Sequence, residues 1–227
     1  NAAVDIPFDI CSGQSFSFDP QDVIDGIVPA GTTYSWVFTN ENGNLSGSSN
    51  GSGTSISGTI FNSDTRRRNV DYVVTPTYNG CAGAPFTIRV RVQPEPDLAP
   101  IANPAAVCNG ASVGPFNFTG NAVLVPGGGS IAPTAYNWTN DNPSIGLAAS
   151  GTGNIPSFST INNGVVPVQA NITVTPRANG CDGPSQTFTI TVNPTPKVTV
   201  VPDYCVVGGQ VQLIANSNVA GSTFLWN

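Results

Sequence analysis

Apolar and polar residues alternate with a period of two along most of the chain. Segments 15–18 and 115–118 each place two phenylalanines on one face of an extended backbone. Segment 86–92 alternates in the same way, with Arg89 and Arg91 opposite the apolar positions. No stretch keeps a helical apolar period over three turns. The pattern therefore predicts β-strands from end to end.

Turn residues separate these predicted strands at short intervals. Asn-Gly pairs stand at 42–43, 79–80 and 179–180, and three consecutive glycines stand at 127–129. Turn signals every 8–12 residues between short alternating strands are typical of an antiparallel sandwich. We expect six or seven strands in each domain and an all-β fold of the immunoglobulin-like or PKD-like class.

The sequence repeats itself at a period of about 97 residues. Cys11, Cys108 and Cys205 recur at that spacing, and VTPTYNGC at 74–81 matches VTPRANGC at 174–181. The first two units end in prolines spaced by one residue, which favour an extended and semi-rigid joint. The repeat therefore predicts three domains, which are called repeat 1 (1–97), repeat 2 (98–196) and repeat 3 (197–227, incomplete).

Repeat 3 begins like the others but holds too few residues to close a sandwich. We expect the chain to be a fragment of a longer one. The alternative is that strands from a partner chain complete the unit, as in donor-strand complementation.

One tryptophan occupies the same place in the third predicted strand of each repeat, at Trp36, Trp138 and Trp226. A large aromatic residue on a central strand commonly anchors a sandwich, so these residues are predicted to be structural core. The functional alternative is a platform on which a sugar ring stacks.

Composition excludes several classes of function. The chain has no histidine, so no histidine-based acid–base pair or triad and no imidazole metal ligand exist. Seven basic residues against thirteen acidic ones give a net charge of -6, which does not fit nucleic-acid binding. No apolar run is long enough to cross a membrane as a helix. Two carboxylates could hydrolyse a glycoside, but the acidic residues differ between repeats, so we do not expect an enzyme.

Five cysteines at paired spacings indicate an oxidising compartment. The pairing favoured by the spacing is Cys11 with Cys81 and Cys108 with Cys181, which leaves the partner of Cys205 outside the chain. In a simple immunoglobulin topology, however, both members of each pair would lie at opposite ends of their sandwich, too far apart for a disulfide. Either the strand order differs from that scheme or the thiols stay free.

Several repeated words carry a family resemblance, among them ICSGQ at 10–14, VPAGTTYSW at 28–36, YVVTP at 72–76 and TIRVRVQPEP at 87–96. They resemble the PKD-like, immunoglobulin-like repeats of very large cell-surface adhesins of gliding Bacteroidetes that are exported by type IX secretion. The resemblance implies an outer-surface location and a role in adhesion or in carrying an adhesive tip. It also implies three kinds of partner, namely neighbouring repeats, surface polysaccharide and the outer-membrane motility or secretion machinery.

Asp19, Asp22 and Asp25 form the densest acidic cluster, and oxygen ligands on a short loop could hold calcium. Their spacing is not that of an EF-hand loop, and repeat 2 lacks acids in the corresponding stretch, so a solvated loop is the simpler interpretation. No other cofactor is expected.

Two further charged groups could be binding sites, but repeat 2 lacks both of them. Glu95 and Asp97 resemble a calcium-stiffened joint, but the second linker carries Thr195 and Lys197 instead. The run Arg66-Arg67-Arg68 could bind an anionic glycan, but repeat 2 has no equivalent, which favours a solvated turn.

These observations favour a structural role, in which tandem sandwich domains form the stalk of an extracellular adhesin. The alternative function is a carbohydrate-binding accessory module of a secreted multidomain protein, which would require exposed aromatic residues on one face or loop tip.

Overall fold

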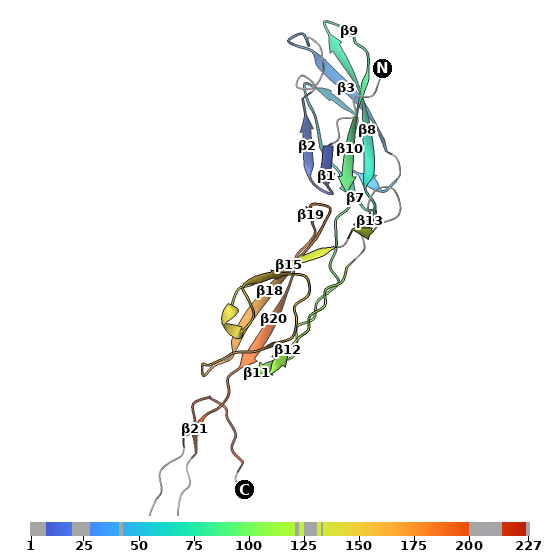
Figure 1. The fold of residues 1–227 in the computed structure, drawn as a ribbon. Helices are drawn as coiled ribbons and strands as arrows, with labels where there is room; N and C mark the ends of the chain where they lie inside the picture. The colour runs from blue at the N-terminus through green and yellow to red at the C-terminus, as the bar shows by residue number, and fades with distance from the viewer. Residues whose placement is uncertain are drawn as a thin grey trace, which may run out of the picture. The chain divides into compact units, whose positions relative to one another are not determined.

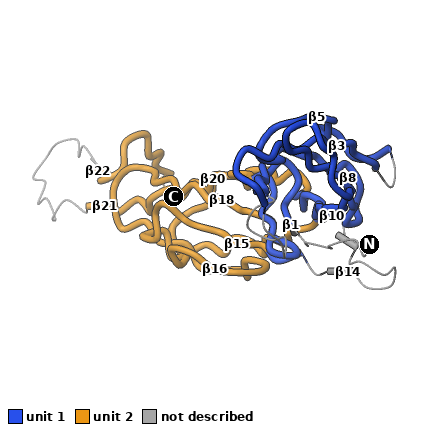
Figure 2. Tube along the Cα trace, turned by 90° about the horizontal axis from the view of Figure 1, so that it is seen from above, with its two compact units in different colours: residues 1–98, 120–135, 176–184 blue, residues 99–119, 136–175, 185–227 orange. Residues whose placement is uncertain are grey.

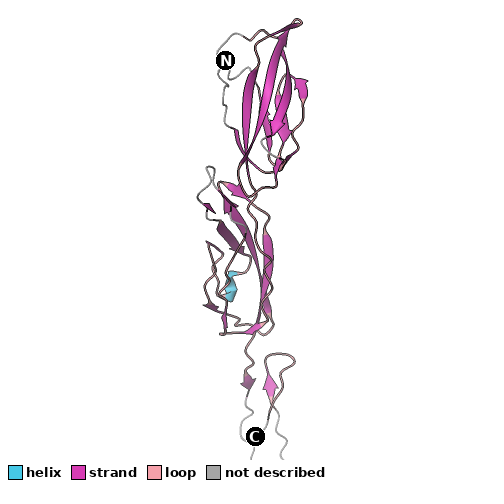
Figure 3. Cartoon of the chain, turned by 90° about the vertical axis from the view of Figure 1, so that its right-hand side faces the viewer, coloured by secondary structure: helices cyan, strands magenta, loops and turns pink. Residues whose placement is uncertain are grey.

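The computed structural model describes residues 8–19, 28–40, 43–120, 123–124, 131–132, 134–199 and 215–225. Within these ranges the regular secondary structure consists of strands and one turn of 3-10 helix, η2 (Pro143–Ile145) (Figure 3). Contacts divide the chain into two compact units (Figure 2). Unit 1 comprises Asn1–Leu98, Gly120–Ala135 and Pro176–Pro184, and unit 2 comprises Ala99–Thr119, Tyr136–Thr175 and Ser185–Asn227.

Repeat 1 contains a six-stranded sheet faced by a smaller layer (Figure 1). The first strand of the sheet runs parallel to its neighbour and every other pairing is antiparallel. Its order is β1 (Phe8–Cys11), β10 (Phe86–Gln93), β8 (Arg68–Tyr78), β3 (Thr33–Asn40) and β5 (Gly51–Gly53), with β9 (Cys81–Ala82) on β8. The other layer pairs β2 (Ser15–Phe18) with β6 (Ile56–Thr59), and β4 (Leu45–Ser46) pairs with β7 (Phe61–Asn62).

The core of repeat 1 lies between these layers. The period-two pattern of the sequence places alternate side chains of β2, β8 and β10 inside, and Phe16 of β2 packs against Tyr72 of β8 with ring centroids 5.6 Å apart. This is the packing of a sandwich, in which side chains from two facing sheets fill one core. The fully buried strand residues of β8 and β10 include Val70, Val74, Ile88, Val90 and Val92.

Repeat 2 has the same strand order. Its six-stranded sheet comprises β11 (Val107–Cys108), β20 (Gln186–Asn193), β18 (Val168–Ala178), β15 (Ala135–Asn140) and β16 (Ser150–Thr152), with β19 (Cys181–Asp182) on β18. Three short pairs accompany it, namely β12 (Ser112–Val113) with β17 (Phe158–Ser159), β13 (Val123–Leu124) with β14 (Ile131–Ala132), and, in repeat 3, β21 (Val198–Thr199) with β22 (Asn216–Ser217). The predicted fold class, tandem antiparallel β-sandwich domains, is confirmed.

The limits predicted for the three repeats stay predictions, because contacts group the chain differently from the sequence. The two large sheets lie within residues 8–93 and 107–193. The tip of the β18–β19 hairpin, residues 176–184, nevertheless belongs to unit 1, although it is part of repeat 2 in the sequence. No helix among the described residues has the length and apolar character required to span a membrane.

Two hairpins end in the predicted Asn-Gly turns. Asn79 and Gly80 have φ of 47° and 80°, and Asn179 and Gly180 have φ of 51° and 83°. Positive φ at both central residues defines the turn type that matches the twist of two-residue hairpins, and Asn-Gly tolerates it best. The hairpins β8–β9 and β18–β19 therefore have the same turn geometry.

A buried asparagine recurs in both repeats and was not recognised in the sequence. The side-chain amide of Asn62 donates to the carbonyls of Arg66 and Val92, at 2.8 and 2.9 Å. Asn162 donates likewise to Val166 and Val192, both at 2.8 Å. In each case the side-chain oxygen accepts a backbone N–H two residues further on. The asparagine thus ties a loop to the end of the last strand of the sandwich.

Asn162→Ala is expected to lower the free energy of unfolding by about 1–3 kcal/mol, because it leaves the buried carbonyl of Val192 without its donor. Urea denaturation of the chain and the variant measures this loss. Asn163→Ala is the matched control, because Asn163 is exposed. Equal stability of the two variants would show that the buried amide is not a structural tie.

Candidate functional site

The described acidic residues do not gather into a metal site. Asp19 is exposed just after β2, while Asp22 and Asp25 lie outside the described residues. In the part of the chain that the structure describes, no three potential metal ligands come together. Glu95 is exposed and Asp97 is half-buried in the segment that follows β10. The solvated loop stays the prediction for the acidic cluster, with calcium binding as its alternative.

Arg67 and Arg68 of the basic run contact acidic side chains, while Arg66 is exposed. The Nε of Arg68 donates to Asp64 Oδ2 at 2.6 Å, and Arg67 and Arg91 each lie within 4.0 Å of Asp9. These ion pairs neutralise part of the positive charge that an anionic glycan would contact. The arrangement fits a charged surface of a structural domain.

The hydrogen bond from Arg68 holds the pKa of the Asp64 carboxyl below its usual value of 3.8. A carboxyl with a lowered folded-state pKa stabilises the fold above its unfolded pKa, and this contribution is lost as the pH falls through the folded value. Asp64→Asn should therefore cost a few tenths to about 1 kcal/mol at pH 7 and much less at pH 2. Urea titrations at the two pH values measure the difference. An equal loss at both would assign the effect to packing rather than to charge.

The two described tryptophans rest on glycines of the neighbouring strand. Trp138 is 6% exposed and lies on Gly151, where a Cβ would overlap the indole ring. Trp36 is half-buried on Gly51, where a Cβ would lie 2.6 Å from the ring. The Trp36 Nε1 donates to the Ser49 carbonyl at 3.2 Å. Trp226 lies outside the described residues.

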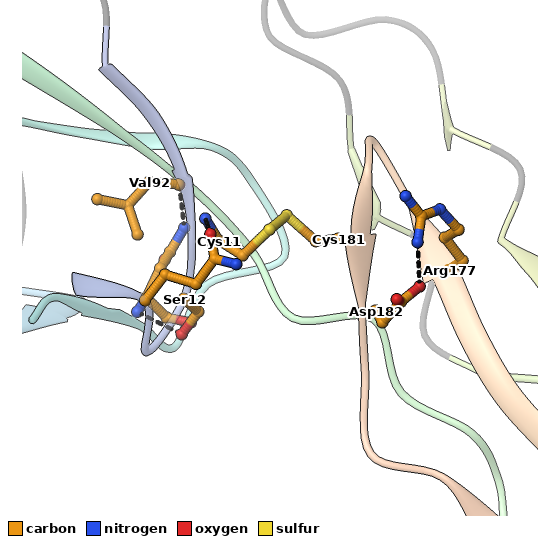
Figure 4. Close-up of a disulfide and its surroundings, with 8 residues drawn as sticks. Cys11, Ser12, Val92, Arg177, Cys181 and Asp182 are labelled. Carbon is orange, nitrogen blue, oxygen red and sulfur yellow. Dashed lines mark hydrogen bonds and ion pairs between the residues drawn. A yellow bond between two sulfur atoms is a disulfide. The ribbon is translucent and has the colours of Figure 1, made fainter. Parts of the chain in front are cut away.

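The cysteines do not pair as predicted. Cys11 forms a disulfide with Cys181, with Cα atoms 5.6 Å apart and 170 positions between them in the sequence (Figure 4). Cys81 and Cys108 are exposed and outside any disulfide in the described part of the chain. The predicted pairs Cys11–Cys81 and Cys108–Cys181 are therefore wrong, and Cys205 lies outside the described residues.

Strand register explains the correction. In the sheet of repeat 1, Cys11 stands beside Gln93 at one end of β10. Cys81 lies in the hairpin beyond Phe86, at the other end of the same strand. Seven residues of strand separate Phe86 from Gln93, which is roughly 24 Å at about 3.4 Å per residue. No disulfide spans that distance, so the partner of Cys11 comes from another repeat.

The disulfide lies in a defined structural setting within unit 1, which we name the clasp: Cys11, Pro96 and the hairpin tip 176–184. Arg177 donates to Asp182 at 2.7 Å across the hairpin, as Figure 4 shows. Gly183 faces the carbonyl of Pro96 so closely that a Cβ would overlap it. Cys181 is 2% exposed in this packing. The clasp links repeat 1 and repeat 2 covalently. The sequence had predicted disulfides only within single repeats.

Comparison with known proteins supports the fold of a repeat domain. The model of the family described as "PKD-like domain" matches residues 8–96, which span β1 to β10. Residues 8–96 are thus similar to a PKD-like domain, and the fold class of the chain is a tandem of antiparallel β-sandwiches. No curated protein sequence matches the chain.

Three solved structures illustrate how distant the structural similarities are. Mouse cadherin-23 EC22-24 is 10% identical, with a TM-score of 0.34, over 96% of this chain and 76% of that one. A C-terminal intimin fragment, in complex with the intimin-binding domain of the translocated intimin receptor, is 14% identical with a TM-score of 0.38, over 83% and 62%. Titin domains A168-A170 are 13% identical with a TM-score of 0.31, over 82% and 62%. The chain spans less than two thirds of the intimin and titin chains, and scores this low support no functional conclusion.

Proposed function

We propose that the chain is a stalk or spacer segment of a large extracellular adhesin at the outer surface of a gliding Bacteroidetes bacterium. On this proposal the adhesin is exported by type IX secretion and acts in gliding motility or surface attachment. Its partners are neighbouring repeats of the same chain, with surface polysaccharide or the outer-membrane motility and secretion machinery engaged elsewhere along it. The chain itself performs no catalysis.

The observation that carries the proposal is the contrast between what the two repeats keep and what they change. Both keep the buried amide at Asn62 and Asn162 and the Asn-Gly hairpin turn. The charged segment that holds Asp64 and Arg68 in repeat 1 has no charged counterpart in repeat 2, where Asn162 is followed by Asn163 and Gly164. Residues that build the fold recur, and residues that could contact a ligand do not, as expected of a spacer.

The repeats also favour a spacer because a disulfide joins them. A covalent link between consecutive repeats adds nothing to the binding of a ligand by one module, but it resists separation of the modules under load. This feature distinguishes the stalk from a carbohydrate-binding module, in which each domain would act alone.

The proposal is tested on cells that produce the protein. An antibody raised against the chain should label intact cells, and in-frame removal of residues 98–196 should preserve export while reducing attachment or gliding. Substituting exposed loop residues, such as Asn163, should leave both unchanged. Loss of attachment on substitution of the loops alone would contradict a spacer role.

The alternative function, a carbohydrate-binding module, has one feature in its favour: Phe61 and Tyr78 are exposed aromatic residues, at 52% and 41%. A glycan array probed with the whole chain separates the two functions. The spacer predicts no bound glycan. Binding that is abolished by Phe61→Ala or Tyr78→Ala would establish the alternative.

A further inference from the structure

Cys81 and Cys108 are the repeat counterparts of the two cysteines that form the clasp disulfide. We propose that both belong to further clasps, so that the early cysteine of each repeat bonds the hairpin cysteine of the next repeat along the chain. Cys108 would bond the hairpin cysteine of a complete repeat that follows it. Cys81 would bond the early cysteine of a repeat that precedes it. The pairing rule stands on geometry alone, and only its mechanical consequence rests on the proposed stalk.

The turn that carries Cys108 reproduces the turn that carries Cys11. After Cys11, Ser12 N–H donates to Gln93 at 3.0 Å, Gly13 N–H to Ile60 at 2.8 Å, and Gln14 N–H back to Cys11 at 3.0 Å. The three corresponding bonds after Cys108 run from Asn109 to Asn193 at 2.8 Å, from Gly110 to Thr160 at 2.8 Å, and from Ala111 to Cys108 at 3.0 Å. Cys108 is therefore presented as Cys11 is, and it is exposed.

The hairpin that carries Cys81 likewise reproduces the hairpin that carries Cys181. Cys81 stands opposite Tyr78, as Cys181 stands opposite Ala178. The N–H of Gly83 donates to Pro76 at 2.8 Å, and the N–H of Gly183 donates to Pro176 at 2.9 Å. The two hairpins thus present their cysteines on the same backbone, but Cys181 is buried by its partners while Cys81 is exposed.

A hollow lies beside Cys81, next to the β8–β9 hairpin. It has a volume of about 230 Å³, and its lining includes Val28, Pro76, Tyr78, Cys81 and Gly83. The corresponding glycine of repeat 2, Gly183, is covered by the backbone of Pro96. We assign the hollow to the Pro-x-Pro segment of a preceding repeat, seated there as Pro96 is seated on Gly183.

The proline that follows the last strand of the sheet is buried in repeat 1 and exposed in repeat 2, as expected if only the first is covered by a hairpin of the next repeat. Pro96, which follows β10, is buried in the clasp. Its counterpart Pro196, which follows β20, is exposed together with the early cysteine of the same repeat, Cys108. Repeat 2 therefore presents an uncovered proline and an unbonded cysteine at the positions where repeat 1 has covered and bonded ones.

Formation of each clasp is a two-electron oxidation. Two thiols lose two protons and two electrons and form one S–S bond. An organic disulfide, such as the oxidised dithiol of a thiol oxidoreductase, accepts them and is reduced to two thiols. Exposure of Cys81 and Cys108 allows that exchange.

The rule has a mechanical consequence for a stalk. Tension that enters at Cys11 passes through the disulfide to Cys181 and bypasses the residues between them. From Cys181 it follows 24 residues to Cys205, the next early cysteine of the same series. Those residues extend to at most about 86 Å, at 3.3–3.6 Å each. A chain clasped in this way would lengthen little under load even when a sandwich unfolds.

The test is a head-to-tail tandem, in which residues 1–196 precede a complete second copy of the chain. Folded under oxidising conditions, alkylated and digested without reduction, it should yield a linked peptide between Cys108 of the first copy and Cys81 of the second. It should contain one more disulfide, and two fewer reactive thiols, than the sum of its separately produced parts. Cys81→Ser in the second copy is the control, because it should free Cys108 and leave Cys11–Cys181 intact.

Two results would overturn the proposal: both thiols staying reactive in a tandem whose Cys11–Cys181 bonds have formed, or linked peptides that join cysteines of the same repeat. Pulling the tandem by its ends tests the consequence. The oxidised chain should release less than half of the length released in reductant, and equal release would refute the mechanical part. Neither readout depends on export or adhesion, so failure here leaves the proposed stalk to its own test.

Discussion

Removing the Cys11–Cys181 disulfide is expected to lower the free energy of unfolding of the chain by up to about 5 kcal/mol. The bond closes a loop of 170 positions, and in the chain-entropy model a loop of that length restricts the unfolded chain by about that amount. The double variant Cys11→Ser/Cys181→Ser, compared with the parent by denaturant titration without reductant, measures the loss. Adding reductant to the parent should produce the same shift.

Cys108→Ser is the matched control for this prediction. Cys108 occupies the same turn but is exposed and outside any disulfide of the described chain, so its replacement should change the free energy of unfolding by less than about 0.5 kcal/mol. If Cys108→Ser destabilised the chain as strongly as the double variant, Cys108 would have to be part of a disulfide, and the observed pairing would be contradicted.

Trp138→Ala should cost about 3–5 kcal/mol, the usual range for deleting a buried indole from a packed core. The ring is 6% exposed and rests on Gly151, which has no side chain that could fill the space left by the indole. Thermal or urea denaturation measures the loss. Trp138→Phe should lose less, because the indole N–H is buried with no acceptor among the described residues, and its removal offsets part of the lost contact area.

Trp36→Ala is the matched comparison in repeat 1. Trp36 is half-buried and donates to the Ser49 carbonyl, so its removal leaves a smaller cavity, and the variant should lose less stability than Trp138→Ala. If both substitutions left stability unchanged and abolished binding to a glycan instead, the tryptophans would be a binding platform rather than core.

Most strands and the two Asn-Gly hairpins could be predicted because their signals are local, although segment 115–118 forms only an isolated bridge between Phe116 and Ile155 rather than a strand. Alternation places Phe16 and Phe18 on one face, and both are buried. The Asn-Gly pairs at 79–80 and 179–180 adopt the positive φ that their turn requires. Each of these inferences needs only a few neighbouring residues, and each repeat offers a second copy against which to check it.

The disulfide could not be predicted in the same way, because the choice of partner is not local. Spacing within a repeat shows that Cys11 and Cys81 belong to one sequence unit, but it does not show which hairpin lies beside Cys11. The opposite-ends argument already counted against pairing within a repeat. The sequence does not show where residues 176–184 lie. By contact they belong to the unit that contains repeat 1, although by sequence they are part of repeat 2.

The buried asparagines were missed although a signal existed. Asn62 and Asn162 stand 100 positions apart, each directly after a large apolar residue, Phe61 or Ile161. A polar residue that recurs amid changing loop residues is a candidate for a buried hydrogen-bonding role. Asparagine is so common in turns that its partners, the carbonyls of Val92 and Val192, emerge only from the fold.

Peptide mapping of the oxidised, unreduced chain tests the central claim most directly, namely that consecutive repeats are joined covalently. After alkylation of free thiols and digestion, mass spectrometry should find one linked pair of peptides, containing Cys11 and Cys181, with Cys81 and Cys108 alkylated. Linked peptides that join Cys11 to Cys81 and Cys108 to Cys181 would contradict it, because each repeat would then be a separate, internally bridged domain.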